Sequence, residues 1–200
     1  MPDGTGDGRD SGRERDGVAR GPSMAAEEER IAKASLAELP ENGTVILDAG
    51  SVTERLAAHL PADHDYTVIT NSIPVAVALA GRTDITVHLM GGRLHRRAGA
   101  TLPGPRELEG LSVDVAFVVP GGVSFDRGLT SCDPAEGSGK KAIMDVARRV
   151  VALTDHTRIG DDRLSRFAAL QDVDCLITDT GLHEEAAERL RARVPRLLRV

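Results

Sequence analysis

The chain has 200 residues, of which 40% are hydrophobic and 2% aromatic, and its formal net charge at pH 7 is −6. This length suffices for one α/β domain with an aliphatic core, and the acidic balance argues against non-specific binding of nucleic acid through a broad basic face. No apolar run is long enough to span a membrane, and Cys132 and Cys175 show neither metal-ligand spacing nor a disulfide framework, so a cytoplasmic location is expected.

The first part of the chain differs in composition from the rest. Residues 1–23 are rich in Gly, Asp and Arg and have no apolar period, which predicts a disordered polar tail. Its acids outnumber its bases, which favours a solvated tail over a contact with nucleic acid. Residues 24–200 are predicted to form one domain, which opens with a helix over 24–39 because acidic residues stand near its start and apolar residues recur near one face.

Apolar runs and helical patterns then alternate along the chain. Strands are predicted at 44–47, 66–69, 85–90, 113–119, 150–153, 175–178 and 196–200, and helices at 53–60, 74–80, 135–148 and 184–193. Nearly continuous apolar strands indicate a sheet covered on both faces. The alternation predicts an α/β fold with a mostly parallel, doubly wound sheet and helices on both faces.

The junction after the first predicted strand has the features of an anion site. Asp48 ends the strand, Gly50 breaks it, and Ser51 and Thr53 stand in the first turn of the next helix. Free N–H groups and the helix dipole favour an anion at such a start. The alternative is that Ser51 serves only as the N-cap of that helix.

Four other short polar or Gly-rich loops follow predicted strands. They are 70–72 with Asn71 and Ser72, 91–93 with Gly91 and Gly92, 120–122 with Gly121 and Gly122, and 154–156. In a parallel sheet these loops meet at one edge. A polar ligand approached closely by backbone would explain them, and so would the ordinary turns that every α/β protein needs.

The segment 128–141 carries the strongest candidate for a charged group in the site. Asp133 and Pro134 predict a helix start, and Glu136 and Lys140 are four residues apart on one face of that helix. This pair is either a surface salt bridge of little energetic worth or a lysine aimed at an anion and oriented by Glu136.

Other candidates for chemistry are weaker. His156 stands beside Asp155, but no nucleophile is identifiable with it, so a structural or binding role is favoured over that of a general base. Cys132 is interpreted as an ordinary loop residue, since nothing nearby clearly lowers its pKa. The remaining histidines lack ligand spacing, and no metal, cofactor or catalytic residue is predicted.

A series of motifs follows in a recognisable order along the chain. They read ILDAGSVT, VITNSIPVAVAL, VHLMGGRL, VDVAFVVPGGVS, GLTSCDPAEGSGKKAIM, VVALTDHTRIG and VDCLITDTG. In this order and spacing they resemble the C-terminal sensor domain of DeoR/GlpR-type transcriptional regulators, over about residues 27–200. The resemblance implies a Rossmann-like α/β fold related to ribose-5-phosphate isomerase and glucosamine-6-phosphate deaminase. It also implies a phosphorylated sugar or related metabolite as effector, and a homo-oligomer.

The resemblance also places the effector on particular residues. The family's Asp-Ala-Gly-Thr-Thr-Thr loop is matched by Asp48, Gly50, Ser51 and Thr53, and its Thr-Asn-Ser motif by Asn71 and Ser72. Its Gly-Gly turn is matched by Gly91 and Gly92, and the lysine after its Asp-Pro-Ala-Glu helix start is matched by Lys140. Phosphate is expected at residues 50–53 with Lys140, and sugar hydroxyls at Asp48, Asn71 and Asp133. Gly121 and Gly122 complete the expected site.

Two departures from the family pattern bear on function. The winged helix-turn-helix that normally precedes this domain has no counterpart before Met24, so contact with DNA is expected only through a separate or missing segment. Gly121 stands where the family has a polar residue, which lowers the odds of catalysis. The sequence therefore predicts an effector-sensing domain and not an enzyme; the alternatives are a phosphosugar isomerase or deaminase-like enzyme and a degenerate oligomerisation domain.

Overall fold

The computed structural model describes residues 24–200, and the predicted tail over residues 1–23 lies outside this part. The strands are β1 (Gly43–Leu47), β2 (Tyr66–Thr70), β3 (Ile85–Leu89), β4 (Arg93–His95), β5 (Ala100–Leu102), β6 (Val115–Val118), β7 (Gly122–Ser124), β8 (Gly128–Ser131), β9 (Val150–Leu153), β10 (Ser165–Ala168), β11 (Cys175–Thr178) and β12 (Leu197–Arg199). The α-helices are α1 (Met24–Ser35), α2 (Ser51–Ala58), α3 (Ile73–Leu79), α4 (Pro134–Asp145) and α5 (Glu184–Arg191).

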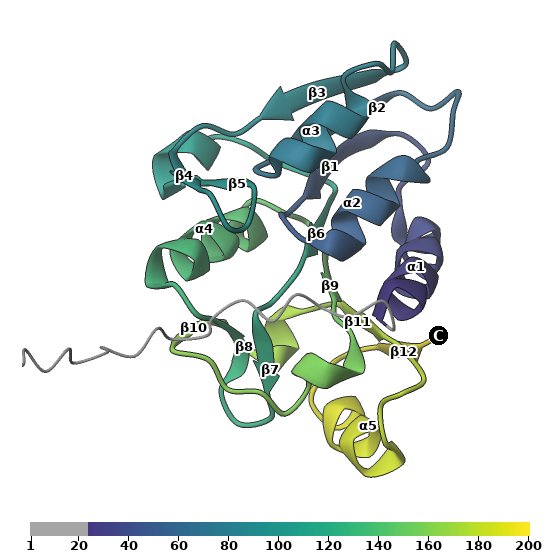
Figure 1. The fold of residues 1–200 in the computed structure, drawn as a ribbon, viewed down its shortest axis with the longest axis vertical. Coiled ribbons are helices and arrows are strands. Elements are labelled where there is room, and N and C mark those ends of the chain that lie inside the picture. The colour runs from purple at the N-terminus through teal and green to yellow at the C-terminus, as the bar shows by residue number, and fades with distance from the viewer. Residues whose placement is uncertain (1–23) are drawn as a thin grey trace, which may run out of the picture.

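The central sheet has seven strands in the order β12-β11-β9-β6-β1-β2-β3 (Figure 1). All of its neighbouring strands run parallel. One face is covered by α1, α2 and α3, which Figure 1 shows in a row, and the other by α4 and α5. The predicted doubly wound α/β fold is therefore confirmed.

The central strands are apolar throughout because both of their faces are covered. Every residue of β6, β9 and β11 is buried. Alternate residues of each strand belong to opposite cores: Ile46 packs with α4, whereas Val45 and Leu47 pack with α1 and α2. None of the described helices is long and apolar enough to cross a membrane.

The predicted boundaries differ from the structure at several ends. The helix predicted over 24–39 is α1 followed by a 3₁₀ turn at Leu36–Glu38, and the strand predicted over 113–119 pairs regularly only over Val115–Val118. The antiparallel sheet β10-β8-β7 and the β4–β5 hairpin were not predicted. Their strands have three or four residues, which is too short for an alternating pattern to be recognised.

The order of connections places one junction in the middle of the sheet. From β1 the chain proceeds to β2 and β3 on one side, and from β6 it proceeds to β9, β11 and β12 on the other. The direction of winding therefore reverses between the neighbouring strands β1 and β6. Open α/β sheets bind their ligands outside the carboxyl ends of the strands at such a reversal.

A buried carboxylate joins the loops that follow β9 and β11. Asp179, just after β11, has no exposed surface and accepts hydrogen bonds from the backbone N–H of His156 (2.8 Å), from Nδ1 of His156 (2.7 Å) and from the N–H of Gly181 (2.8 Å). Burial alone would raise the pKa of Asp179, but these donors outweigh it and hold the pKa below its usual value.

This carboxylate should make the stability of the domain sensitive to acid. A carboxyl whose pKa is depressed by folding stabilises the native state fully above its unfolded pKa of about 3.9 and progressively less as the pH falls through the folded pKa. We expect Asp179→Asn to lower the free energy of unfolding by about 1–3 kcal/mol at neutral pH, because an amide N–H₂ would face backbone donors.

The difference in the free energy of unfolding between the wild type and Asp179→Asn should shrink below about pH 4. Urea denaturation followed by circular dichroism from pH 7 to pH 3 measures it, with Asp126→Asn as a control at a carboxylate whose side chain is 84% exposed. A difference independent of pH would contradict this assignment.

Candidate functional site

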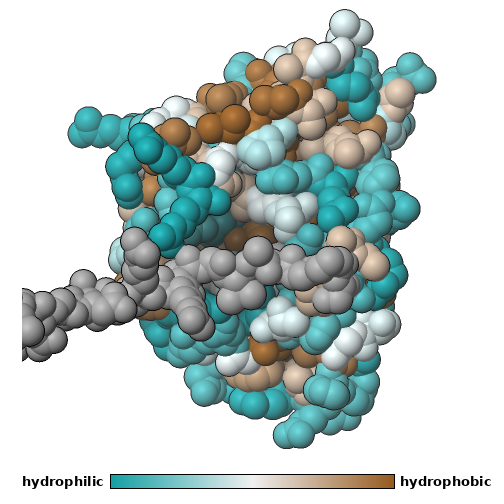
Figure 2. Space-filling view, in the orientation of Figure 1, coloured by the Kyte–Doolittle hydropathy of each residue, from teal (hydrophilic) through white to brown (hydrophobic). Residues whose placement is uncertain are grey.

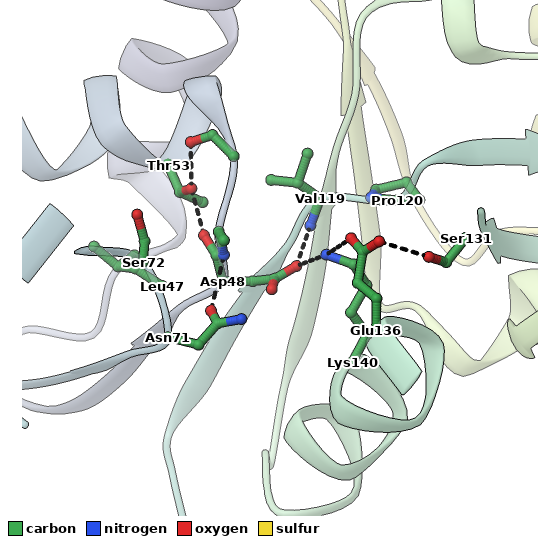
Figure 3. Close-up of polar contacts among 12 residues, drawn as sticks. Leu47, Asp48, Thr53, Asn71, Ser72, Val119, Pro120, Ser131, Glu136 and Lys140 are labelled. Carbon is green, nitrogen blue, oxygen red and sulfur yellow. Dashed lines mark hydrogen bonds and ion pairs between the residues drawn. The ribbon is translucent and has the colours of Figure 1, made fainter. Parts of the chain in front are cut away.

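A buried ion pair lies at the reversal point of the sheet (Figure 3). Asp48, at the carboxyl end of β1, and Lys140, in α4, are 0% and 2% exposed. Lys140 Nζ lies 2.5 Å from Asp48 Oδ2, and the same oxygen accepts the N–H of Val119, just after β6, at 3.0 Å. One carboxylate oxygen thus joins β1, β6 and α4.

Glu136 extends this pair toward the surface. Its Oε1 lies 3.3 Å from Lys140 Nζ, and its Oε2 accepts the hydroxyl of Ser131 at 2.8 Å. Burial alone would lower the pKa of Lys140, but the two carboxylates outweigh it and hold the pKa above its usual value. The predicted Glu136–Lys140 pair is confirmed, and the alternative of a surface salt bridge is wrong because Lys140 is buried.

The other oxygen of Asp48 lacks a partner. Oδ1 is buried, and none of the side chains or backbone groups of residues 24–200 donates a hydrogen bond to it. Leaving a buried charged acceptor without a donor costs about 1–3 kcal/mol or more. A donor from outside the described residues, such as a water molecule or a ligand hydroxyl, would remove this cost.

Asn71 ties the neighbouring loops together. Its Oδ1 accepts the N–H of Ala49 at 2.9 Å, and its Nδ2 donates to the carbonyl oxygen of Thr101, in β5, at 3.2 Å. Ser72 accepts the N–H of Val75 and caps α3. Asn71 is therefore at the site but uses both ends of its amide to hold loops, and Ser72 serves the helix that follows.

The start of α2 is built around Gly50, Ser51 and Thr53. Gly50, and not Ser51, is the N-cap, and a Cβ at Gly50 would lie 2.8 Å from the side chain of Val119. The hydroxyl of Thr53 lies within hydrogen-bond distance of the carbonyl oxygens of Asp48 and Gly50 (2.5 and 2.8 Å), so it shapes the turn.

Ser51 connects this turn to α1. Its hydroxyl donates to Oε1 of Glu28 at 2.5 Å, and Glu28, which is 4% exposed, also lies 3.4 Å from Nε of Arg55. A carboxylate of the chain itself thus lies beside the positive end of the α2 dipole. The anion predicted at this helix start has an internal counterpart in Glu28.

The predicted glycines serve mainly the close approach of backbone. Gly92 has φ of +123°, and a Cβ there would lie 2.3 Å from a carbonyl oxygen of the hairpin. A Cβ at Gly121 or Gly122 would lie 3.2 or 2.6 Å from a carbonyl oxygen of a neighbouring segment. Gly91 is different, since a Cβ there would meet no other atom within 4 Å, and it lines a groove beside β3.

Charged side chains of both signs lie around the site formed by Asp48 and Lys140. Asp133 caps α4 through the N–H of Ala135 (2.8 Å), and its Oδ2 lies 3.7 Å from Arg93. Arg158 donates to the carbonyl oxygen of Pro120 at 2.6 Å. Figure 2 shows a hollow near the centre of this face, between the parts where Figure 1 places α2 and α4.

Sequence reasoning missed several partners that complete the site. Glu28, Ser131 and Thr101 contact predicted residues, but each contact joins elements that are distant in sequence or lies in the unpredicted small strands. Cys132 and Cys175 are free thiols, exposed and buried respectively. In residues 24–200 no three side chains of the metal-ligating types gather around a common point.

Comparisons with known proteins agree with this arrangement. A family model described as the DeoR C terminal sensor domain matches residues 23–180. The chain is 34% identical over 160 residues to the HTH-type transcriptional repressor GlcR of Bacillus subtilis, covering 78% of this chain and 61% of that protein. It is 32% identical over 165 residues to the HTH-type transcriptional regulator GlpR of Haloferax volcanii, covering 81% and 64%. It therefore spans less than two thirds of the length of these relatives.

Solved structures show the same fold at low identity. The probable sor operon regulator of Shigella flexneri has a TM-score of 0.52 at 13% identity, over 82% of this chain and 89% of that one. Ribose 5-phosphate isomerase A of Methanocaldococcus jannaschii has a TM-score of 0.51 at 15% identity, over 68% and 55%. The relatives found by sequence are named as regulators of transcription and not as enzymes. With a family model matching well over half of its length, the chain belongs to the DeoR C-terminal sensor domain family.

Proposed function

We propose that this domain senses a phosphorylated sugar, or a related phosphorylated metabolite, at the site around Asp48 and Lys140, and so controls the DNA binding of a transcriptional regulator. The observation that carries the proposal is the buried, unpartnered Oδ1 of Asp48 beside the ion pair at the reversal point of the sheet. A sugar hydroxyl is a donor of the kind that this oxygen needs.

The two halves of such a ligand fit different parts of the site. The first turn of α2, with Gly50 and Ser51, offers the N–H groups and dipole that favour a phosphate. Lys140 offsets part of the negative charge of Asp48 and Glu136, which would otherwise repel a phosphate bound nearby. Hydroxyls would meet Asp48, Asn71 and Asp133. Gly91, Gly92, Gly121 and Gly122 let backbone approach the ligand, and Ser72 and Thr53 hold the loops.

An isomerase or deaminase activity is less well supported by the same residues. A general base needs a carboxylate free to accept a proton from substrate. Asp48 and Glu136 are both bound to Lys140, and Gly121 has no side chain to take that role. Sensing without turnover is therefore the function that we propose.

Glu28 gives the site a physical connection to the N-terminal side of the domain. Because Ser51 contacts Glu28 of α1, an anion that binds at the start of α2 would compete with that carboxylate and shift α1. Contact with DNA would be made by a helix-turn-helix outside the described residues, either in the same chain or on a partner protein. The regulator would act in the cytoplasm as a homo-oligomer.

A thermal-shift screen tests the proposal directly. A phosphorylated sugar at about 100 times its dissociation constant should stabilise the domain by about 2.7 kcal/mol, whereas its unphosphorylated counterpart at the same concentration should not. Ser51→Ala should weaken binding of the phosphorylated compound by about tenfold, and Ser138→Ala, at an exposed serine of α4, should leave it unchanged.

Absence of any shift with a panel of phosphorylated sugars at millimolar concentration would contradict the proposal and favour a domain kept for assembly only. A shift followed by conversion of the ligand, detected by chromatography, would favour the enzyme instead.

The ion pair should also be essential to the fold. Lys140→Met would leave two neighbouring carboxylates without their cation and should lower the free energy of unfolding by about 3–5 kcal/mol. Lys141→Met is the matched control, because that lysine is half exposed and pairs with Asp145 at the surface, so about 0.5 kcal/mol or less is expected. Equal losses of unfolding free energy for the two substitutions in urea denaturation would show that the buried pair contributes no more to stability than a surface pair.

A further inference from the structure

Helix α3 has an unusual composition for a helix at the surface. Residues Ile73–Leu79 read IPVAVAL and contain no polar side chain. One side packs against α2, β2 and β3, but Val77 is 70% exposed and Ala78 is also exposed. A helix that is apolar on all sides is normally buried, so its outer side is suited to contact with another surface.

The strand beside α3 is an open edge. Within residues 24–200, β3 pairs with β2 and with no further strand, so one row of its N–H and C=O groups is unpaired. Its residues ITVHL include no Asp, Glu, Lys or Arg, although these types make up 28% of the chain. Natural edge strands are commonly protected by charges, proline or bulges, and β3 has none of these within its span.

The opposite face of β3 is also uncovered. The connections from β1 through β2 to β3 place both of their helices, α2 and α3, on one face of the sheet. On the other face a groove of about 480 Å³ runs beside β3, with His88, Leu89 and Leu111 among its lining residues. Leu89 and Leu111 are 51% and 40% exposed. Because side chains alternate along a strand, His88 faces this groove and Leu89 shares the α3 side with Ile85 and Val87. Exposed apolar side chains thus stand on both sides of the edge, Leu89 on the α3 side and Leu111 at the groove.

We call this the β3 edge surface and define it by six exposed residues. They are Val77, Ala78, Thr86, His88, Leu89 and Leu111. In Figure 2 hydrophobic residues gather over the upper part of the molecule, where Figure 1 places α3 and β3. The part of this surface beside α3 thus lies at the β3 end of the sheet.

The charge of this surface indicates what covers it. It carries no Lys or Arg, which disfavours nucleic acid and anionic lipid. Arg82 and Asp84, just before β3, pair with each other, and Glu107 lines the groove beside Leu111. The chain as a whole has a net charge of −6, so two copies approach with least repulsion through a neutral, apolar surface. An edge strand is also complementary to itself, because antiparallel pairing about a two-fold axis joins identical residues reciprocally.

We propose that two copies of this chain associate through the β3 edge surface, with β3 pairing antiparallel to β3 of the second copy and α3 packing against its counterpart. The two central sheets then become one continuous sheet across the two-fold axis. The strand pairing supplies backbone hydrogen bonds, and the side chains of Val77 and Leu89 are buried from water in the same interface. This inference does not depend on the identity of the effector.

Sedimentation velocity of the full chain at micromolar concentration tests the proposal. The wild type should be dimeric, and Val77→Glu and Leu89→Lys, which introduce charges of opposite sign, should each raise the dissociation constant of the dimer by about 100-fold or more. Leu164→Glu, at a leucine that is 73% exposed near β10, is the matched control and should remain dimeric. Circular dichroism should show unchanged folding in all three variants, since the replaced side chains are exposed.

A mixing experiment identifies the occupant of the surface. Because the two copies of Val77 face each other across the axis, Val77→Glu mixed with Val77→Lys should recover dimers that neither variant forms alone. A monomeric wild type, dimers unaffected by both Val77→Glu and Leu89→Lys, or no recovery on mixing would each overturn the proposal, the last by showing that the surface does not meet its own copy.

Discussion

The buried pair between Lys140 and Asp48 is the interaction on which the rest of the site depends. It joins residues 92 positions apart and brings α4 against the end of β1. Taking both charges out of water is expensive, and the attraction between them offsets that cost only when their geometry and additional hydrogen bonds are good. Val119 N–H and Glu136 supply those bonds, so the loops after β1 and β6 are held in place by the same pair that a ligand would meet.

The strand order that defines the fold also determines where the site lies. Because the winding reverses between β1 and β6, their two loops diverge and leave room above the sheet. The remaining loops are then tied back to that point by side-chain bonds to backbone, as with Asn71 and Ala49. Many of the polar residues at strand ends therefore serve structure first, and the oxygen of Asp48 that no described group engages is an exception.

The sequence is sufficient for the main architecture but not for the contacts that make the site. The strands of the central sheet are predictable because burial on both faces makes them continuously apolar, and β9 and β11 agree with their predicted limits. The helix pair Glu136–Lys140 is predictable from its spacing. Glu28 as the partner of Ser51 is not, because three glutamates in succession look alike until the packing of α1 on α2 selects one.

The long sequence separations within the site also bear on how the protein reaches its native state. Asp48 meets Val119 across 71 residues and Lys140 across 92, so neither contact forms until large loops have closed, and closing them costs chain entropy that only the assembled sheet repays. A partly folded chain that has completed only β1, α2 and β2 lacks the cation and one wall of the site. A ligand that contacts both walls would therefore bind only the finished domain, and its binding would stabilise that state over its incomplete precursors.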